Sequence, residues 1–351
     1  MNKLKKLAEL LLALSLFTGV LAGCGSNSAN LNSNENPNQI AQKEPDKITV
    51  QSLWLPQGQF AGLYVAKELG FYEDEGIDVT ILPGGTDVSS EEQVENDVAQ
   101  VGVAFYSSVL TYQEGGYDFI NVFQTFKESP QYLVAKAGSG ITSGKDLKGK
   151  KVGSWFGGRQ YEFYALAQKY GYDIQKDINW VQQDYTMDQF ISGEIDVASA
   201  MSYNEYLLLL ENFKEEEINV IDMNKEGVAM LEDCLFVKRS WAEKNRDLLV
   251  RFLRATIKGW KYTAENPEKA AEIVHEIGQT SSLQHQINMI KKVIEFVIPK
   301  GSDSDKIGYL DREKIQQTID LGFNTGLIKN KIDIDKSIDS SYWEEAIRGI
   351  K

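Results

Sequence analysis

Three short loops of this chain combine aromatic, amide and charged side chains that suit the binding of a flat, polar molecule. The first loop contains Trp54, Gln57 and Gln59. An indole ring offers a stacking face, and amide groups donate and accept hydrogen bonds at the edge of a stacked ring. Trp54 could instead cap the core, and the two glutamines could belong to a solvated loop. We expect a binding loop, because this composition is unusual for a connector.

The second loop places an aromatic ring, glycines and an arginine ahead of a helix. Its residues are Trp155, Gly158 and Arg159, and the helix opens with Tyr161 and Glu162. Glycine allows a ligand to approach the backbone closely, and the free N–H groups of a helix start suit a carbonyl or anionic edge. Glu162 could instead only complement the helix dipole. The loop lacks the Gly-Lys-Ser/Thr ending of a phosphate-binding loop.

Polar groups also follow other predicted strands. Tyr203, Asn204 and Glu205 open a helix directly after a strand, where a carboxylate could accept hydrogen bonds from a ring N–H and an amino group. A simple N-cap and a first-turn glutamate are the alternative for Asn204 and Glu205. Asp233 is a similar candidate, and Tyr106 stands at another helix start. A buried carboxylate here needs a donor from the ligand or from an arginine.

These loops lie at the ends of predicted strands. Ile48, Val50, Ser52 and Trp54 alternate with period two, which is typical of a strand, and helical spacing follows from Phe60. This alternation and, further on, short apolar runs predict strands at residues 47–54, 77–82, 101–105, 119–126, 131–137, 152–155, 179–183, 195–201, 218–223 and 235–238. Beyond the last strand the chain is predicted to be helical, with helices at residues 241–266, 267–277, 285–297 and 311–321.

The order of these elements predicts an α/β protein with two lobes. Strands alternate with helices in the first part of the chain, which favours a parallel sheet with helices on its faces. A second series of similar size is nested inside the first. We expect residues 47–134 and 235–351 to form lobe I and residues 135–234 to form lobe II, with segments 132–137 and 234–238 crossing between them. A ligand cleft would then lie between the lobes, at the strand ends.

Composition narrows the possible functions. The chain has 351 residues, 42% of them hydrophobic and 25% charged, with a formal net charge of −14. This charge argues against nucleic acid as a partner. Cys234 lies in an apolar run and is expected to be a small buried hydrophobe. The two histidines, His275 and His285, are expected away from the strand-end loops, and no Cys/His spacing matches a metal site. We expect no metal, no cofactor and no catalytic residue.

The N-terminus has the pattern of an export signal. Three lysines precede an apolar stretch at residues 7–21, which ends at Ala22, Gly23 and Cys24. This pattern resembles a bacterial lipoprotein signal, with residues 1–23 removed and a lipid attached to Cys24; a plain signal peptide or an uncleaved anchor is the alternative. Residues 24–46, rich in Asn and Ser, are expected to form a disordered tether. The protein is therefore expected to be extracytoplasmic and lipid-anchored to the cell membrane.

Several motifs resemble those of a known family. Residues 60–79, 146–153 and 192–198 are similar to segments of the substrate-binding proteins of ABC importers, which have the type II periplasmic-binding-protein fold. Trp155-Phe-Gly-Gly, Met201-Ser-Tyr-Asn-Glu and Met230-Leu-Glu-Asp resemble the branch that binds pyrimidine precursors of thiamine. The resemblance covers about residues 47–300. The same branch is related in fold to the yeast synthase that makes such a precursor.

The resemblance implies a binding protein. Its ligand would be a small planar heteroaromatic nutrient, with formylaminopyrimidine or hydroxymethylpyrimidine, used in thiamine biosynthesis, ahead of riboflavin or another flavin-like ring. Its partners would be a permease and an ATPase subunit, and it would act as a monomer. The yeast synthase uses a histidine and a lysine-bound pyridoxal cofactor, with a Cys-rich motif. This chain has no Cys cluster and no histidine expected near a strand-end loop, so we expect no enzymatic activity.

Overall fold

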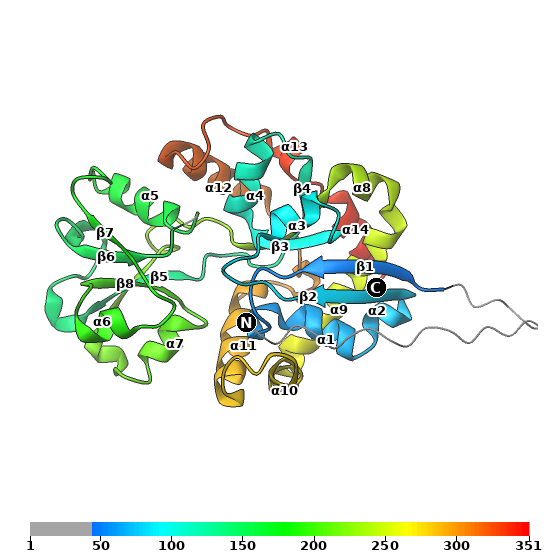
Figure 1. Cartoon of the computed structure of the whole chain (residues 1–351), viewed down its shortest axis with the longest axis horizontal. Coiled ribbons are helices and arrows are strands. Elements are labelled where there is room, and N and C mark those ends of the chain that lie inside the picture. Colours follow the sequence, from blue (N-terminus) through cyan, green and yellow to red (C-terminus); the bar gives the residue numbers. More distant parts are fainter. Residues whose placement is uncertain (1–43, 157, 351) are drawn as a thin grey trace, which may run out of the picture. The chain divides into compact units, whose positions relative to one another are not determined.

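The computed structural model describes residues 44–156 and 158–350. Within them, two five-stranded sheets carry helices on their faces (Figure 1). The predicted signal segment, the predicted lipid attachment at Cys24 and all but the end of the predicted tether lie outside the described residues. No helix in the described part of the chain is both long enough and apolar enough to span a membrane.

The first sheet has the strand order β2-β1-β3-β10-β4. Its strands are β1 (Asp46–Gln51), β2 (Ile77–Leu82), β3 (Val101–Phe105), β4 (Phe119–Gln124) and β10 (Asp233–Lys238). The parallel pairing predicted for the first part of the chain is present between β1 and β2 and between β1 and β3. β10 runs antiparallel to both β3 and β4 and lies between them. Cys234 is buried on this strand, as predicted.

The second sheet repeats this arrangement, with the order β7-β6-β8-β5-β9. Its strands are β5 (Gln131–Lys136), β6 (Lys151–Ser154), β7 (Asn179–Gln182), β8 (Val197–Met201) and β9 (Ile218–Asp222). β6 is parallel to β7 and β8, whereas β5 is antiparallel to β8 and β9. In Figure 1 this sheet is green, and the first sheet is mostly blue and cyan. Each sheet therefore contains one antiparallel strand in an otherwise parallel set.

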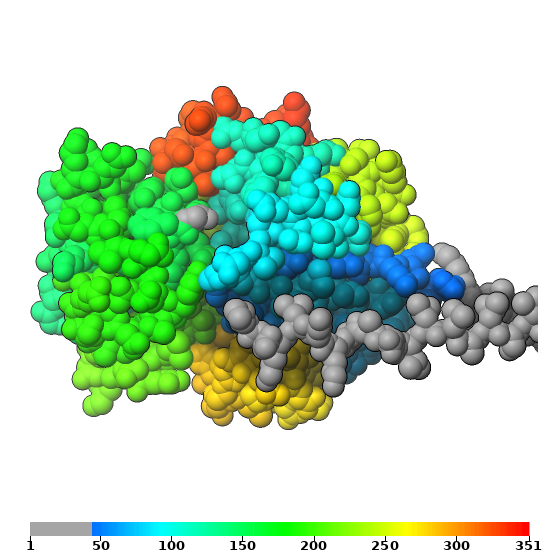
Figure 2. Space-filling view, viewed as in Figure 1, coloured from blue at the N-terminus to red at the C-terminus, as the bar shows by residue number. Residues whose placement is uncertain are grey.

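Helices cover both sheets. They are α1 (Ala61–Glu68), α2 (Phe71–Asp74), α3 (Ser90–Glu95), α4 (Tyr106–Glu114), α5 (Tyr161–Lys169), α6 (Asp188–Ser192), α7 (Glu205–Leu209), α8 (Arg239–Lys244), α9 (Arg246–Glu265), α10 (Pro267–Gly278), α11 (Leu283–Val297), α12 (Arg312–Thr325), α13 (Ile334–Ser337) and α14 (Ser341–Arg348). The C-terminal residues pack onto the first sheet, since Ile338 forms a bridge with Asn121 of β4. Figure 2 shows the C-terminal segments, in orange and red, beside the cyan segments that belong to the first sheet and its helices.

The single helix predicted at residues 241–266 was wrong, because Asn245 interrupts it. The backbone of Asn245 has φ −123° and ψ 34°, outside the helical region. Its side-chain Nδ2 donates to the carbonyl oxygen of Trp241 at 2.9 Å. Asparagine favours such local hydrogen bonds over a regular helix, so the chain turns here and α9 starts anew.

α1 and α9 pack closely through two glycines. A Cβ atom at Gly259 of α9 would overlap the carbonyl oxygen of Gly62 in α1, and one at Gly62 would overlap the indole ring of Trp260. Glycine normally weakens a helix by about 1 kcal/mol relative to alanine. Here it allows the two helix backbones to approach each other, and this contact holds α1 in place behind the loop that precedes it.

Candidate functional site

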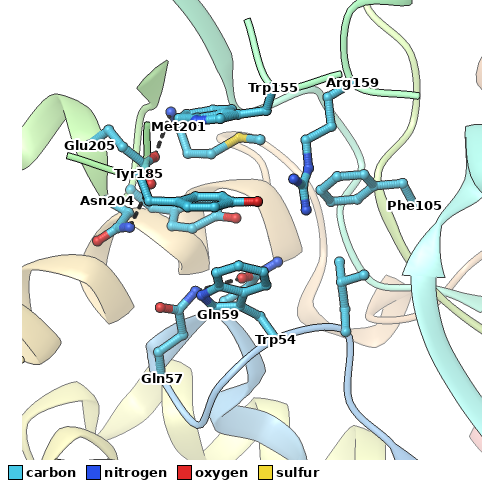
Figure 3. A pocket seen from close by; sticks show the side chains of 12 residues that line it. Trp54, Gln57, Gln59, Phe105, Trp155, Arg159, Tyr185, Met201, Asn204 and Glu205 are labelled. Carbon is cyan, nitrogen blue, oxygen red and sulfur yellow. Dashed lines mark hydrogen bonds between the residues drawn. The ribbon is translucent and has the colours of Figure 1, made fainter. Parts of the chain in front are cut away.

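A pocket lies where loops from the two sheets meet (Figure 3). It holds about 530 Å³ of empty space, including its open mouth. The first sheet supplies the loop after β1 and the end of β3, and the second sheet supplies residues that follow β6, β7 and β8. The lining residues are Leu53, Trp54, Gln57, Gln59, Phe105, Trp155, Arg159, Tyr185, Met201, Tyr203, Asn204 and Glu205. The position at the carboxyl ends of strands is the one that ligands prefer in α/β folds.

Three aromatic rings form a stack across this pocket. The ring of Tyr185 lies between those of Trp155 and Trp54 (Figure 3), with centroid distances of 6.2 Å and 5.0 Å and interplanar angles of 8° and 42°. Trp155 is fixed by a hydrogen bond from Nε1 to the carbonyl oxygen of Asp184 at 3.0 Å. Tyr185 is 46% exposed, so its side chain is the least confined of the three. Such rings offer flat faces to a planar ligand.

Arg159 brings a cation to the side of the stack. Its guanidinium carbon lies 6.0 Å from the ring centroid of Trp54 and 5.1 Å from that of Phe105. We find no hydrogen bond or ion pair from this guanidinium to any other residue between 44 and 350 that the structure describes. Its planar set of N–H donors is therefore available for a carbonyl or an anionic group of a ligand.

Asn204 links a buried carboxyl group to a histidine. Its Nδ2 donates to Oε1 of Glu205 at 2.8 Å, and the backbone N–H of Met201 donates to Oε2 at 3.0 Å. Burial raises the pKa of Glu205. The Oδ1 atom of Asn204 lies 2.9 Å from Nε2 of His285, whose pKa is lowered by burial. The expectation that both histidines are remote from the strand-end loops was therefore wrong for His285.

The two glutamines of the first loop form a chain of hydrogen bonds that ends on Asp233. Gln57 Nε2 donates to Gln59 Oε1 at 2.7 Å, and Gln59 Nε2 donates to both carboxyl oxygens of Asp233 at 3.0 and 2.9 Å. Asp233 is buried behind the pocket, and burial raises its pKa to about 7. The chain fixes the direction of both amides. It leaves the Gln57 amide oxygen free of these bonds, so that oxygen can accept from a ligand.

Three other predicted residues lie away from the lining. Tyr106 is fully buried and its hydroxyl hydrogen-bonds to Ser337 Oγ at 2.6 Å. Tyr161 packs its ring against that of Tyr164. Gly158 has a φ of 114°, which favours glycine, and its N–H donates to a side chain two residues later. Gly158 shapes the loop that carries the arginine, whereas the two tyrosines belong to the packing.

Glu162 is buried at the start of α5 and contacts both segments that connect the sheets. Its Oε2 accepts from Ser129 Oγ at 2.9 Å, and its Oε1 accepts from the backbone N–H of Met230. Burial raises the pKa of Glu162 to about 8. Glu232, nearby, is 2% exposed, and its pKa is raised by burial and by the charge of Glu162. Glu162 thus joins the two connecting segments to the second sheet and does not line the pocket.

Four lining residues were missed in the sequence analysis: Leu53, Phe105, Tyr185 and Met201. Tyr185 follows β7 just as Trp155 follows β6, so the rule that selected aromatic residues after strands would have found it. Phe105 and Met201 are the last residues of β3 and β8 and read as core positions. The described residues contain no group of three His, Cys, Asp or Glu side chains placed to hold a metal ion.

Comparisons with known proteins agree with this architecture. The model of the family "NMT1/THI5 like" matches residues 57–270. The riboflavin-binding protein RibY of Chloroflexus aurantiacus is 25% identical over 87% of this chain and 88% of its own length. The formylaminopyrimidine-binding protein of Halalkalibacterium halodurans is 21% identical over 77% of this chain and 78% of its own.

A solved structure supports the fold. The periplasmic aliphatic sulphonate-binding protein SsuA of Escherichia coli superimposes with a TM-score of 0.67 at 17% identity, covering 84% of this chain and 92% of that one. The α/β class and the two sheets fit this likeness. The chain therefore belongs to the NMT1/THI5-like family and has the two-lobed fold of periplasmic substrate-binding proteins.

Proposed function

We propose that this substrate-binding protein of the ABC-importer type captures a small planar heteroaromatic nutrient. The observation that carries the proposal is the stack of Trp54, Tyr185 and Trp155, contributed by loops of both sheets around one pocket. Aromatic stacking contributes about 0.5–1.5 kcal/mol beyond the burial of area for each ring pair. An aliphatic chain gains no such geometric preference, so the stack favours a ring over an aliphatic sulfonate.

The polar groups around the stack suit the edge of a heterocycle. Arg159 offers donors, the Gln57 amide oxygen offers an acceptor, and the carboxyl group of Glu205 lines the pocket with a pKa that burial raises. An aminopyrimidine with a formyl or hydroxymethyl group presents matching donors and acceptors, and so does the ring edge of a flavin. The similarity to formylaminopyrimidine-binding and riboflavin-binding relatives supports both candidates.

The proposal includes a location and partners. The part that carries the first sheet (residues 46–124 and 233–350) and the part that carries the second sheet (residues 131–222) would act as two lobes that close over the ligand by a hinge motion. The strands β5 and β10 lie wholly within one sheet each, so the lobe boundaries fall before β5 and before β10, and not at residues 134 and 234 as expected from the sequence. The loaded monomer would dock on a permease, with an ATPase subunit driving import, while a lipid on Cys24 holds it at the membrane. No catalytic step is proposed, because stacking and edge contacts explain the pocket residues without one.

Binding can be tested with purified protein and three ligands: formylaminopyrimidine, riboflavin and an alkanesulfonate. We expect one of the two heterocycles to quench tryptophan fluorescence and raise the melting temperature, and the sulfonate to do neither. Trp155→Ala should weaken binding roughly 10- to 100-fold, since it removes a stacking face and its buried area. Trp241→Ala, on α8 and outside the pocket, is the matched control. Binding of the sulfonate alone would refute the proposal.

A further inference from the structure

A second hollow adjoins the aromatic pocket. It holds about 990 Å³ of empty space, open solvent included, and lies on the side of the first sheet where α3 and α4 begin. Five residues line both spaces: Leu53, Trp54, Phe105, Arg159 and Tyr185. Because the same side chains face both, a ligand held against Trp54 and Tyr185 can extend from one space into the other.

The far wall of this hollow is rich in hydroxyl groups. It is lined by Thr86, Ser89, Ser90, Ser108, Thr111 and Tyr112. This composition differs from that of the first pocket, where rings and amides dominate. A wall of hydroxyls forms hydrogen bonds in both directions, since each one donates once and accepts twice.

Glu91 organises this wall. It is 5% exposed, and its carboxylate accepts hydrogen bonds from Ser89 Oγ at 3.0 Å, Ser90 Oγ at 3.3 Å and Ser108 Oγ at 2.5 Å. Ser90 and Ser108 keep their lone pairs for an outside donor, whereas Ser89 Oγ also accepts from the backbone N–H of Glu92 at 3.2 Å. Ser89 Oγ lies 3.2 Å from the hydroxyl of Tyr112, which extends the network. The wall is therefore biased towards accepting hydrogen bonds.

An acceptor-rich wall around a carboxylate suits a neutral chain of hydroxyl groups. At the wall itself an anionic group would meet the negative charge of Glu91, whereas the cation of Arg159 lies where the hollow joins the aromatic pocket. An apolar group would leave the hydroxyls of the wall without partners. A ligand made of a single ring would leave this hollow without a role.

We infer that the ligand has two parts: a planar heteroaromatic ring for the aromatic pocket and a neutral polyhydroxylated side chain for the hydroxyl wall around Glu91. The inference rests on the proposed function, whose ligand it narrows. It selects a flavin that carries a sugar-alcohol chain over a single-ring pyrimidine, and a free flavin over its phosphate.

Three flavins separate the contributions of the two spaces. Riboflavin has the ring and the hydroxylated chain, lumiflavin has the same ring with a methyl group in place of the chain, and flavin mononucleotide adds a phosphate to the chain. Titration calorimetry on the wild-type protein is expected to show riboflavin binding at least 10-fold more tightly than lumiflavin. Flavin mononucleotide should bind more weakly than riboflavin because of the charge of Glu91.

Variants then locate the difference. Ser108→Ala and, independently, Ser90→Ala should reduce riboflavin affinity towards that of lumiflavin while leaving lumiflavin unchanged; Ser240→Ala, exposed on α8, is the control. Glu91→Gln should narrow the gap between riboflavin and its phosphate. Equal affinities for riboflavin and lumiflavin, or an unchanged preference in both serine variants, would overturn the inference.

The same titrations distinguish this inference from the proposed function. If formylaminopyrimidine binds and no flavin does, the two-part ligand is refuted and the planar-ring proposal stands. If neither ligand class binds, both are refuted. If flavin mononucleotide binds more tightly than riboflavin, the wall selects an anion and the neutral chain is refuted.

Discussion

Replacing Gly259 by alanine is expected to destabilise the folded protein by about 3 kcal/mol, the upper part of the usual range for overpacking. The new methyl group would overlap the carbonyl oxygen of Gly62 in α1, and a backbone atom cannot move aside as a flexible side chain can. By intrinsic propensity the same change should stabilise a helix by about 1 kcal/mol. The expected loss therefore has the opposite sign to the propensity effect.

Gly322→Ala is the matched control, because it also places a methyl group on a helix, α12. There the nearest atom to the new Cβ would be a side-chain carbon of Leu327 at 3.3 Å, which can shift by a few tenths of an ångström. Urea unfolding of both variants and the wild type, followed by circular dichroism, measures the effect. If Gly259→Ala is as stable as Gly322→Ala, the close approach of α1 and α9 is not as described.

The second large effect is expected from the pH dependence of stability in Glu162→Gln. Burial raises the pKa of Glu162 to about 8, and its ordinary value is 4.5. Between these values the unfolded chain releases a proton that the folded protein keeps, so the folded state binds more protons. Its stability therefore falls as pH rises through this window, by about 1.4 kcal/mol for each pH unit per group. Below pH 4.5 and above pH 8, Glu162 does not make the free energy of unfolding depend on pH.

Glutamine removes this titration while keeping an acceptor for the backbone N–H of Met230. Between pH 5 and pH 8, the free energy of unfolding of the variant should rise by roughly 3 to 4 kcal/mol relative to that of the wild type. Asp233, with a pKa of about 7, and Glu205, with a raised pKa, give slopes of the same sign that remain in both proteins. Glu232 gives a smaller slope in the variant, because the charge of Glu162 contributes to its raised pKa. The difference between variant and wild type therefore reports Glu162 together with its effect on Glu232.

Urea unfolding at several pH values between 5 and 8 measures this difference. Glu243→Gln, at an exposed position on α8, serves as the control and should follow the wild-type profile. Parallel profiles for Glu162→Gln and the wild type would show that Glu162 is ionised in the folded protein across this range. The two connecting segments would then be held by a charged group.

Sequence patterns located the strand ends but not always the side chain that faces the pocket. A short apolar run identified β3, and Tyr106 was predicted as a site residue because it follows this strand. In the structure Phe105 lines the pocket, while Tyr106 hydrogen-bonds to Ser337. Adjacent residues at the end of a strand point to different sides, so an error of one residue changes which side chain is exposed to a ligand. Trp54 and Trp155 were predicted as site residues from their positions at strand ends, and the structure places both in the lining of one pocket.

Contacts between distant segments left no local pattern. His285 lies on α11 and meets Asn204, which is 81 residues earlier in the chain. The helix that carries His285 could be predicted from apolar periodicity. Which residue His285 contacts, however, depends on how α11 packs against α7. The same holds for Glu162, whose two partners, Ser129 and Met230, come from segments on either side of it in sequence. Such residues need the tertiary structure to be placed.

In the first sheet β10 lies between β3 and β4, although in the sequence it follows all strands of the second sheet. This arrangement affects the order in which the protein can fold. The second sheet comes from one uninterrupted stretch, residues 131–222, and needs nothing that follows it. The first sheet has β10 between β3 and β4, and β10 becomes available only after that whole stretch has emerged. In a chain that is synthesised from its N-terminus, β1 to β4 must therefore wait for β10 while the second sheet, formed by residues 131–222, assembles. The earliest part of the chain is completed last, and until then the edges of β3 and β4 stay open to other partners.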